Sequence, residues 1–182
     1  MEEKELFPGV VLYSNVLDDI DGLLSYMKDS SGSDKWKHDT WPDHRSPGKL
    51  SRSYHQYVLF KNDDFAVSVL DKIKKLDEIL LDYCKKYDVE LLEHETPRAM
   101  IYEPGCFFGA HKDDTFSHPR RVSTVLYIND DYTGGEIFFP LINLRIQPKK
   151  NEFLVFPSAY LFTHEVSEVR DADRFVIVGF GK

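Results

Sequence analysis

Residues 121–140 read RVSTVLYINDDYTGGEIFFP, and this stretch decides the expected fold. It contains two short runs of β-branched and aromatic residues, 122–128 and 136–139, on either side of a turn rich in Asn, Asp and Gly. Four more runs of the same kind lie at 98–103, 144–146, 152–156 and 175–179. Short strands separated by turn residues predict a mainly β jelly roll, a fold whose mouth often holds a metal or a small ligand.

The first 90 residues have a different, helical pattern. Apolar residues at intervals of three and four predict one helix over 16–29, with Asn15 as its cap, and a long amphipathic helix over 64–87. The run 30–50 between them is rich in Ser, Gly, Asp and Pro, and it predicts a long loop of the kind that often carries function. We expect the helices to pack on one outer face of the jelly roll.

The composition limits the class of protein. A chain of 182 residues, 42% hydrophobic, predicts a single domain. No apolar run approaches the ~20 residues that cross a bilayer, and the acidic start lacks the basic residues of a secretion signal, so we expect a soluble, cytoplasmic protein without a membrane partner. Cys84 and Cys106 are expected to be buried thiols. A formal charge of −8 and a pI near 5.3 oppose nucleic-acid binding.

Two histidines and an aspartate have the spacing of a metal site. His111 and Asp113 are two positions apart, so on an extended strand end their side chains project to the same side, whereas Asp114 would point to the other. His164 follows the predicted strand 152–156 and can join them. Two imidazoles and one carboxylate are the ligand set of Fe(II) oxygenases, which leaves open positions for a cosubstrate and O2.

Arg174 lies ten positions after His164. A planar guanidinium pairs bidentately with a carboxylate, so this arginine suits a dicarboxylate cosubstrate. Each residue taken alone has a simpler explanation: the histidines could be ordinary surface residues, and Arg174 could form an ion pair with a nearby acidic residue, Glu168, Asp171 or Asp173. The combination favours the iron site. The remaining histidines, His38, His44, His55, His94 and His118, lie outside this pattern and are assigned no role.

Several segments together resemble the 2-oxoglutarate- and Fe(II)-dependent oxygenases, most closely the prolyl 4-hydroxylase type. They are YEPGCFFGAHKD at 102–113, RVSTVLYIN at 121–129, GGEIFFP at 134–140 and PKKN at 148–151. The resemblance runs through most of the chain. It implies a double-stranded β-helix, which is a cupin-like jelly roll, with iron bound by His111, Asp113 and His164 and no catalytic side chain beyond these ligands.

The same resemblance implies the cofactors: Fe(II), 2-oxoglutarate and O2, with ascorbate as a further candidate. Arg174 would bind the cosubstrate carboxylate, and Tyr127 and Tyr102 would face it, although each could equally be a core tyrosine with a satisfied hydroxyl. Arg174 stands where the closest relatives have lysine. The tryptophan that commonly follows that residue is missing, and Phe175 takes its place.

The expected substrate groove departs further from the family. The segment Ser51-Arg52-Ser53-Tyr54 resembles an Arg-Thr-Ser segment, with Tyr54 in place of serine. Arg98, which replaces a glutamine, and Arg121 also fall at groove positions. Arg52, Tyr54, Arg98 and Arg121 are therefore the candidate substrate-binding residues, and the substitutions leave the substrate open.

The expected function is hydroxylation of a C–H bond, with succinate and CO2 as co-products. The resemblance favours a prolyl residue in a protein or peptide, over which the 30–50 loop would fold. The first alternative keeps this chemistry on a free amino acid or another small molecule. A second, from another class, is a jelly-roll module that binds a metal or ligand without catalysis. A nucleic-acid demethylase is disfavoured by the acidic composition.

Overall fold

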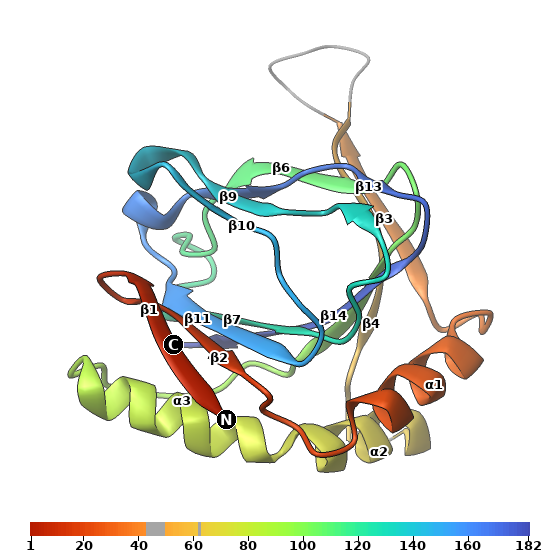
Figure 1. Cartoon of the computed structure of the whole chain (residues 1–182), viewed down its shortest axis with the longest axis horizontal. Helices are drawn as coiled ribbons and strands as arrows, with labels where there is room; N and C mark the ends of the chain where they lie inside the picture. The colour runs from red at the N-terminus through yellow and green to blue at the C-terminus, as the bar shows by residue number, and fades with distance from the viewer. Residues whose placement is uncertain (43–49, 62) are drawn as a thin grey trace.

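The computed structural model describes residues 1–42, 50–61 and 63–182, which form two layers of β-sheet with helices on one outer face (Figure 1). The strands are β1 (Glu2–Phe7), β2 (Val10–Ser14), β3 (Lys37–Pro42), β4 (Leu50–Val58), β5 (Arg98–Tyr102), β6 (Phe107–His111), β7 (Val122–Tyr127), β8 (Thr133–Gly134), β9 (Ile137–Phe139), β10 (Leu144–Ile146), β11 (Glu152–Pro157), β12 (His164–Val166), β13 (Val169–Arg170) and β14 (Arg174–Gly181). The helices are α1 (Ile20–Ser30), α2 (Asp64–Ile73) and α3 (Lys75–Lys86), with short 3-10 turns at Pro140–Ile142 and Tyr160–Phe162.

Twelve of these strands belong to one sheet that folds back over itself. Its order is β1-β2-β11-β7-β14-β5-β4-β6-β12-β9-β10, with β3 added to β4, and β8 and β13 pair separately. In Figure 1, β11, β7 and β14 lie in the lower layer and β6, β9 and β10 in the upper layer, while β4 runs between them. The result is a nearly closed, antiparallel, jelly-roll-like fold, which confirms the expected mainly β fold class with flanking helices.

The central strand β11 shows how the sequence makes the two layers. It pairs with β2 on one side and β7 on the other. Phe153 and Val155 belong to the core beneath the helices, whereas Leu154 and Phe156 belong to the core between the two sheet layers. Because both faces are covered, the strand is apolar from Phe153 to Pro157 instead of alternating with polar residues.

The three helices cover the outer face of the lower layer, as the sequence predicts (Figure 1). Their bounds differ from the prediction. Asp19, not Asn15, caps α1 by accepting a hydrogen bond from the Gly22 amide at 2.9 Å, and Asn15 adopts a left-handed φ of 57° after β2. The long helix expected over 64–87 is divided at Lys74 into α2 and α3, and Asp63 caps the first of them.

The sequence predicts two helices and a loop but no strand in the first 90 residues, whereas the structure has four strands there. β1 and β2 form a hairpin at one edge of the sheet, and β3 and β4 form a second hairpin. The predicted loop over 30–50 is therefore partly strand: β3 pairs with β4, although its side chains are mostly exposed and show no apolar alternation. Residues 43–49 of that expected loop, with His44, lie outside the described residues.

Two further expectations can be compared with the structure. Cys84 and Cys106 are both buried and free. Within the described ranges, every helix is too short or too polar to cross a lipid bilayer.

Candidate active site

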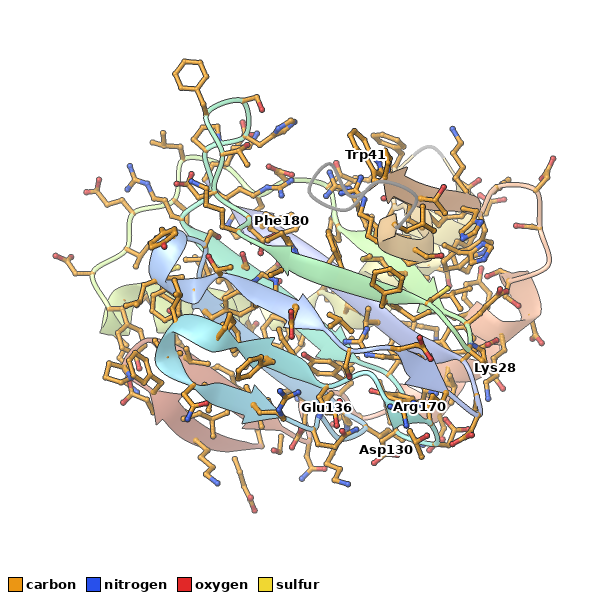
Figure 2. The ribbon with its side chains drawn as sticks, turned by 90° about the horizontal axis from the view of Figure 1, so that it is seen from above. Lys28, Trp41, Asp130, Glu136, Arg170 and Phe180 are labelled. Atoms are coloured by element: carbon orange, nitrogen blue, oxygen red, sulfur yellow. The ribbon has the colours of Figure 1, made fainter. Side chains whose placement is uncertain are left out.

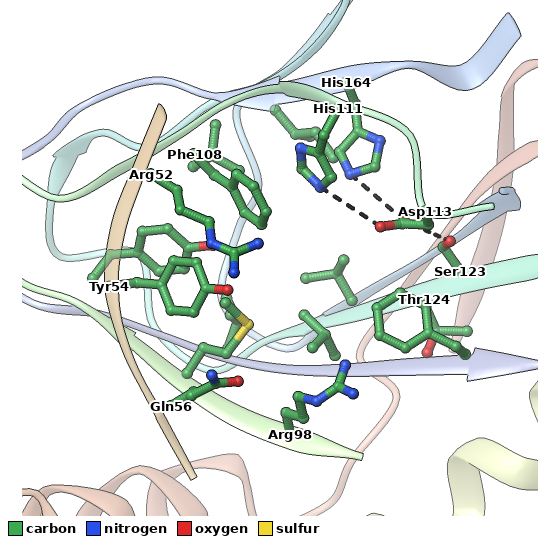
Figure 3. Close-up of a pocket in the computed structure, with 18 of the residues that line it drawn as sticks. Arg52, Tyr54, Gln56, Arg98, Phe108, His111, Asp113, Ser123, Thr124 and His164 are labelled. Carbon is green, nitrogen blue, oxygen red and sulfur yellow. Dashed lines mark hydrogen bonds and ion pairs between the residues drawn. The ribbon is translucent and has the colours of Figure 1, made fainter. Parts of the chain in front are cut away.

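A cavity of about 500 Å³ lies between the two sheet layers and is open to solvent on one side. Figure 3 shows His111, Asp113 and His164 on one side of it, and Arg98 and Gln56 across from them. Arg174, Tyr102 and Tyr127 also line it, as do Arg52 and Tyr54. The structure therefore gathers most of the residues singled out from the sequence around one cavity.

Strand pairing brings the two histidines together. His111 ends β6, His164 begins β12, and the two are directly opposite in the register of these strands. Asp113 follows two residues after His111. Its carboxylate oxygens lie 3.6 Å from Nε2 of His111 and 3.7 Å from Nε2 of His164, and one ligand atom from each residue lies within 4.8 Å of the others. Three side chains that are distant in sequence thus converge on a space that fits one ion.

Backbone and hydroxyl groups orient these three side chains. Nδ1 of His111 lies 2.9 Å from the Gly109 carbonyl oxygen, and Nδ1 of His164 lies 3.0 Å from the Phe162 carbonyl oxygen. A carbonyl accepts only from a protonated nitrogen, so Nε2 of each ring carries the lone pair that faces the cavity. The Ser123 hydroxyl donates to Oδ2 of Asp113 at 2.7 Å.

The electrostatics favour a neutral His164 beside an ionised Asp113. Burial and, to a smaller extent, the neighbouring His111 lower the pKa of His164 to about 4. Burial alone would raise the pKa of Asp113, but His164, His111 and the Ser123 hydroxyl hold it well below its usual range. At neutral pH this is the protonation state that a divalent transition metal requires of its ligands.

Arg174 lies deeper in the cavity, at the start of β14. Only 2% of the residue is exposed, and its guanidinium carbon lies 4.7 Å from the centre of the Tyr102 ring and 5.3 Å from that of Tyr127. Burial would lower the pKa of Arg174, but the surrounding phenol groups of Tyr132, Tyr127 and Tyr102 raise it, so the side chain stays cationic. Within the described residues it forms no ion pair with Asp171 or any other carboxylate, which removes the simpler explanation for this arginine.

Several polar atoms around Arg174 lack a partner. Among the described residues, Nε and one terminal nitrogen of Arg174 have no hydrogen-bond acceptor, and the buried hydroxyls of Tyr127 and Tyr132 are also unpaired. Burial raises the pKa of both phenols, so they remain protonated donors. A buried polar group without a partner is costly. An anion with several acceptor oxygens would satisfy this group of donors.

Gly135 makes room for this arrangement. Its φ is +65°, and a Cβ atom there would lie 2.9 Å from Cδ of Arg174 and 2.9 Å from the ring of Tyr132. The left-handed backbone and the close approach both require glycine. This explains the second glycine of the Gly134-Gly135 turn.

The mouth of the cavity is formed by the β3–β4 hairpin. Asp39 on β3 accepts hydrogen bonds from three side chains of β4: Arg52 at 3.2 Å, Tyr54 at 3.2 Å and Gln56 at 2.9 Å. The guanidinium of Arg52 also lies 5.3 Å from the Phe108 ring centre, and Phe108 stacks on His111 with ring centres 3.6 Å apart. Burial raises the pKa of Tyr54 to about 12. Arg52 and Tyr54 therefore lie at the mouth, connected through Phe108 to the histidines.

Of the remaining candidates, Arg98 lines the cavity but Arg121 does not. Arg121 is exposed and donates to the Glu90 carbonyl oxygen at 2.9 Å. If the strand included Arg121, the alternation of side chains would direct it to the same face as Ser123 and Tyr127. The strand begins only at Val122, after a bend. Arg121 thus lies outside this cavity, which Arg120 lines, and its role in substrate binding stays a prediction.

Sequence reasoning missed four residues: Asp39, Gln56, Ser123 and Tyr132. Ser123 could have been identified from the sequence, because it lies four residues before Tyr127 on β7. Residues an even number of positions apart on a strand face the same side. Tyr132 lies in an irregular turn without periodicity, and Asp39 lies in the stretch expected to be a loop. No local pattern identifies these two.

Comparisons with known proteins agree with this geometry. Residues 97–182 match the model of the 2OG-Fe(II) oxygenase superfamily. A PKHD-type hydroxylase of Prochlorococcus marinus strain NATL2A is 35% identical over 82 residues, which cover 42% of this chain and 36% of the relative. The matched region thus spans about a third of the length of that relative.

Two solved structures have the same fold. One is the viral collagen prolyl hydroxylase of Paramecium bursaria Chlorella virus-1 in a 2OG complex, with a TM-score of 0.70, 20% identity and 94% coverage of both chains. The other is a prolyl hydroxylase from Trichoplax adhaerens in complex with a peptide fragment of the hypoxia inducible factor oxygen degradation domain. Its TM-score is 0.78 at 18% identity, and the match covers 95% of this chain and 83% of the other. At these identities the likeness concerns the fold.

Proposed function

We propose that this chain, which belongs to the 2OG-Fe(II) oxygenase superfamily through residues 97–182 and has the prolyl hydroxylase fold, is a dioxygenase that hydroxylates a prolyl residue in a protein or peptide. Fe(II), 2-oxoglutarate and O2 would be its cofactor, cosubstrate and oxidant, and succinate and CO2 its co-products. Ascorbate would keep the iron reduced.

One observation carries the proposal: His111, Asp113 and His164 converge on one point in the cavity that also contains Arg174, a buried arginine with two nitrogens that have no hydrogen-bond acceptor among the described residues. The donor set fits iron, because two neutral imidazoles and a carboxylate leave positions open for other ligands. The neighbouring donors fit a dicarboxylate, because the Arg174 nitrogens and the Tyr127 hydroxyl are unpaired. When bound, iron with 2-oxoglutarate and O2 supplies the oxidising chemistry that converts a C–H bond to C–OH.

The protein residues bind, orient and exclude water. His111 and His164 would hold the ion through Nε2 and Asp113 through its carboxylate, while the Ser123 hydroxyl fixes the orientation of that carboxylate. Arg174 would hold the distal carboxylate of 2-oxoglutarate. Apolar side chains from four strands line the cavity and keep it dry, namely Ile137, Phe156, Val166 and Val176.

A peptide substrate is supported by the open mouth and by the neighbours. The cavity is open beside the β3–β4 hairpin, where Arg52 and Tyr54 lie. The Trichoplax neighbour is described in complex with a peptide. The hairpin would then contact the residues on either side of the target proline.

A free amino acid or another small molecule is the second candidate substrate. The observation that favours it is the volume of the cavity, about 500 Å³, which lies within the ~300–1,000 Å³ of small-molecule sites. The chemistry at the metal would be the same.

Thermal unfolding tests the cofactors first. Mn(II), used as a redox-inert substitute for iron, should raise the melting temperature, and 2-oxoglutarate should raise it further only after Mn(II), because both bind the folded state. Asp113→Ala should abolish both increases. A wild-type chain that responds to neither ligand would refute the proposal.

A turnover assay then tests the reaction. The chain is incubated with Fe(II), ascorbate, 2-oxoglutarate and a broad set of proline-containing peptides, and the products are analysed by mass spectrometry. The expected product carries one added oxygen, and succinate forms in equal amount. If no peptide is oxidised but free proline is, the substrate is the small molecule.

A further inference from the structure

The mouth of the cavity has the opposite charge to the chain as a whole. The formal net charge of the chain is −8. Apart from the deep residues Asp113 and Arg174, the charged groups that line the cavity are four cations and one carboxylate: Arg52, Arg98, Lys112, Arg120 and Asp39. The charges of a divalent cation and a dicarboxylate bound deeper would cancel, and the charges of Asp113 and Arg174 cancel as well. The mouth therefore keeps an excess of positive charge in an acidic protein.

Glu95, which lies behind the mouth, does not neutralise this excess. Arg120 takes both of its oxygens, at 2.9 Å and 2.6 Å. Arg98 and Lys182 approach the same carboxylate only to 3.7 Å. Lys182 has its own partner, Glu93, at 2.7 Å, so Glu95 is left between Arg120 and Arg98. Arg98 makes no hydrogen bond to any described residue.

Arg98 is also held in place and directed at the cavity. It lies on β5, between Val58 of β4 and Val178 of β14, and 30% of its side chain is exposed. Figure 3 shows it across the cavity from His111 and Asp113. The Phe180 ring centre lies 5.6 Å from its guanidinium and 3.5 Å from that of Arg120, so both arginines share one aromatic ring.

We propose that Arg98, next to Arg120 on the Phe180 ring, binds a carboxylate of the substrate. A fixed guanidinium with free donors that faces a cavity is suited to a carboxylate, which it can bind through two parallel hydrogen bonds. The inference rests on the proposed function, because it concerns the substrate of the same cavity. The carboxylate could belong to an Asp or Glu near the target residue of a peptide, or to a free amino acid; the chemistry of recognition is the same.

Two matched pairs of probes test this subsite. The first is a proline-containing peptide flanked by Asp and Glu, with a twin that has Asn and Gln. The second is N-acetyl-L-proline with N-acetyl-L-prolinamide. Binding is measured by calorimetry in 50 mM NaCl, with the chain loaded with Mn(II) and 2-oxoglutarate and again with the ligand-free chain. In at least one pair the acid should bind about tenfold more tightly than the amide.

Variants assign this preference to Arg98. Arg98→Gln should remove the preference for the acid, and Arg98→Lys should restore part of it. Arg145→Gln is the matched control, because Arg145 also lies over a phenylalanine ring, that of Phe138 at 4.2 Å, but does not line the cavity. Raising NaCl to 300 mM should weaken the acid member only, as expected for a partly exposed charge pair.

The outcomes separate the subsite from the oxygenase function. Equal binding of acid and amide in both pairs, no binding of any probe, or a preference that survives Arg98→Gln overturns the subsite. A preference in the peptide pair alone identifies a polymer substrate, and one in the proline pair alone a small molecule. If Mn(II) and 2-oxoglutarate fail to stabilise the chain while the acid preference persists, the oxygenase proposal fails and the subsite stands.

Discussion

The deep end and the mouth of the cavity differ in burial and in the partners of their polar side chains. At the deep end, Arg174 and Tyr127 are almost completely buried, and they have polar atoms without partners among the described residues. At the mouth, Arg52 and Arg120 are partly exposed, and both already pair with carboxylates of the chain. Buried donors without partners are thus most numerous around Arg174, while at the mouth Nε of Arg52 is also unpaired and Arg98 makes no hydrogen bond within the described residues.

This difference indicates two kinds of ligand. Buried donors without partners cost free energy in the chain alone, so they suit a ligand of constant shape that always supplies the missing acceptors. Arginines that are already paired with carboxylates of the chain, as Arg52 and Arg120 are, can exchange one carboxylate for another. The deep end is thus suited to an invariant metal and cosubstrate, and the mouth to the choice of substrate. Figure 2 shows Phe180 and Trp41, both near the mouth arginines, in the upper half of the view, and Asp130 and Arg170 in the lower half.

The largest expected effect is at the deep end. Asp113→Ala should lower hydroxylation by more than about 100-fold, since even the outer partners of metal ligands contribute about 10–100-fold. Binding of Mn(II), measured by calorimetry, should be lost. Asp114→Ala is the control: the adjacent carboxylate accepts from the Arg120 amide and does not face the histidines. An Asp113→Ala variant that keeps a tenth of the activity would contradict the assignment.

Arg174→Gln tests the second part of the deep end. The substitution removes a buried cation that would pair with 2-oxoglutarate, which typically costs about 2–5 kcal/mol. The KM for 2-oxoglutarate should therefore rise about 30-fold or more, while Mn(II) binding stays unchanged. Arg170→Gln, at an exposed arginine of β13, should leave both unchanged. An unaltered KM in Arg174→Gln would place the cosubstrate elsewhere.

The deep end should also make the metal-free chain sensitive to acid. The folded pKa of His164 is lowered to about 4 from a usual value of 6.5, so between these values the unfolded chain binds more protons than the folded chain. Stability should be complete above pH 6.5 and decrease toward pH 4, by up to about 1.4 kcal/mol per pH unit. The lowered pKa of Asp113 extends the loss to still lower pH.

Urea unfolding in EDTA between pH 4 and pH 8 measures this slope. His164→Asn removes the titrating imidazole and should flatten the dependence above pH 4. A variant with the wild-type slope would show that another group is responsible.

The sequence predicts the deep end well because the relevant spacing is local. His111 and Asp113 share a side through the two-residue period of an extended chain, and a single strand pairing then adds His164. The runs 98–103, 122–128 and 152–156 correspond to β5, β7 and β11 within a residue or two. In these three strands, most of the apolar residues that define the pattern in the sequence are buried in the structure.

The mouth was predicted only in part, through Arg52, Tyr54 and Arg98, because the rest of it depends on non-local pairing and on strand ends. β3 is a mostly exposed strand without an apolar pattern, and only its pairing with β4 places Asp39 beside Arg52. The exchange of Arg121 for Arg120 depends on where β7 begins, which alternation alone does not define. The strands β1 and β2 were missed for a similar reason, since an edge hairpin is stabilised by the sheet it joins.

The smallest expected effect concerns the mouth. Asp39→Asn keeps the shape of the side chain but removes the charge that holds Arg52, while Tyr54 and Gln56 keep a carbonyl acceptor. Loss of this mostly buried charge pair should cost about 1 kcal/mol, the upper end of the range for exposed pairs, so the KM for a peptide substrate should change by about fivefold. The KM for 2-oxoglutarate should not change.

Steady-state kinetics on both substrates checks this prediction, with Asp34→Asn, an exposed aspartate before β3, as the control. The split between the two KM values is the informative quantity, because each belongs to one end of the cavity. If Asp39→Asn weakened 2-oxoglutarate binding as strongly as Arg174→Gln, the two ends would be energetically coupled. The charge pairs of the mouth would then help to form the deep site, and the division between an invariant and an exchangeable half would be wrong.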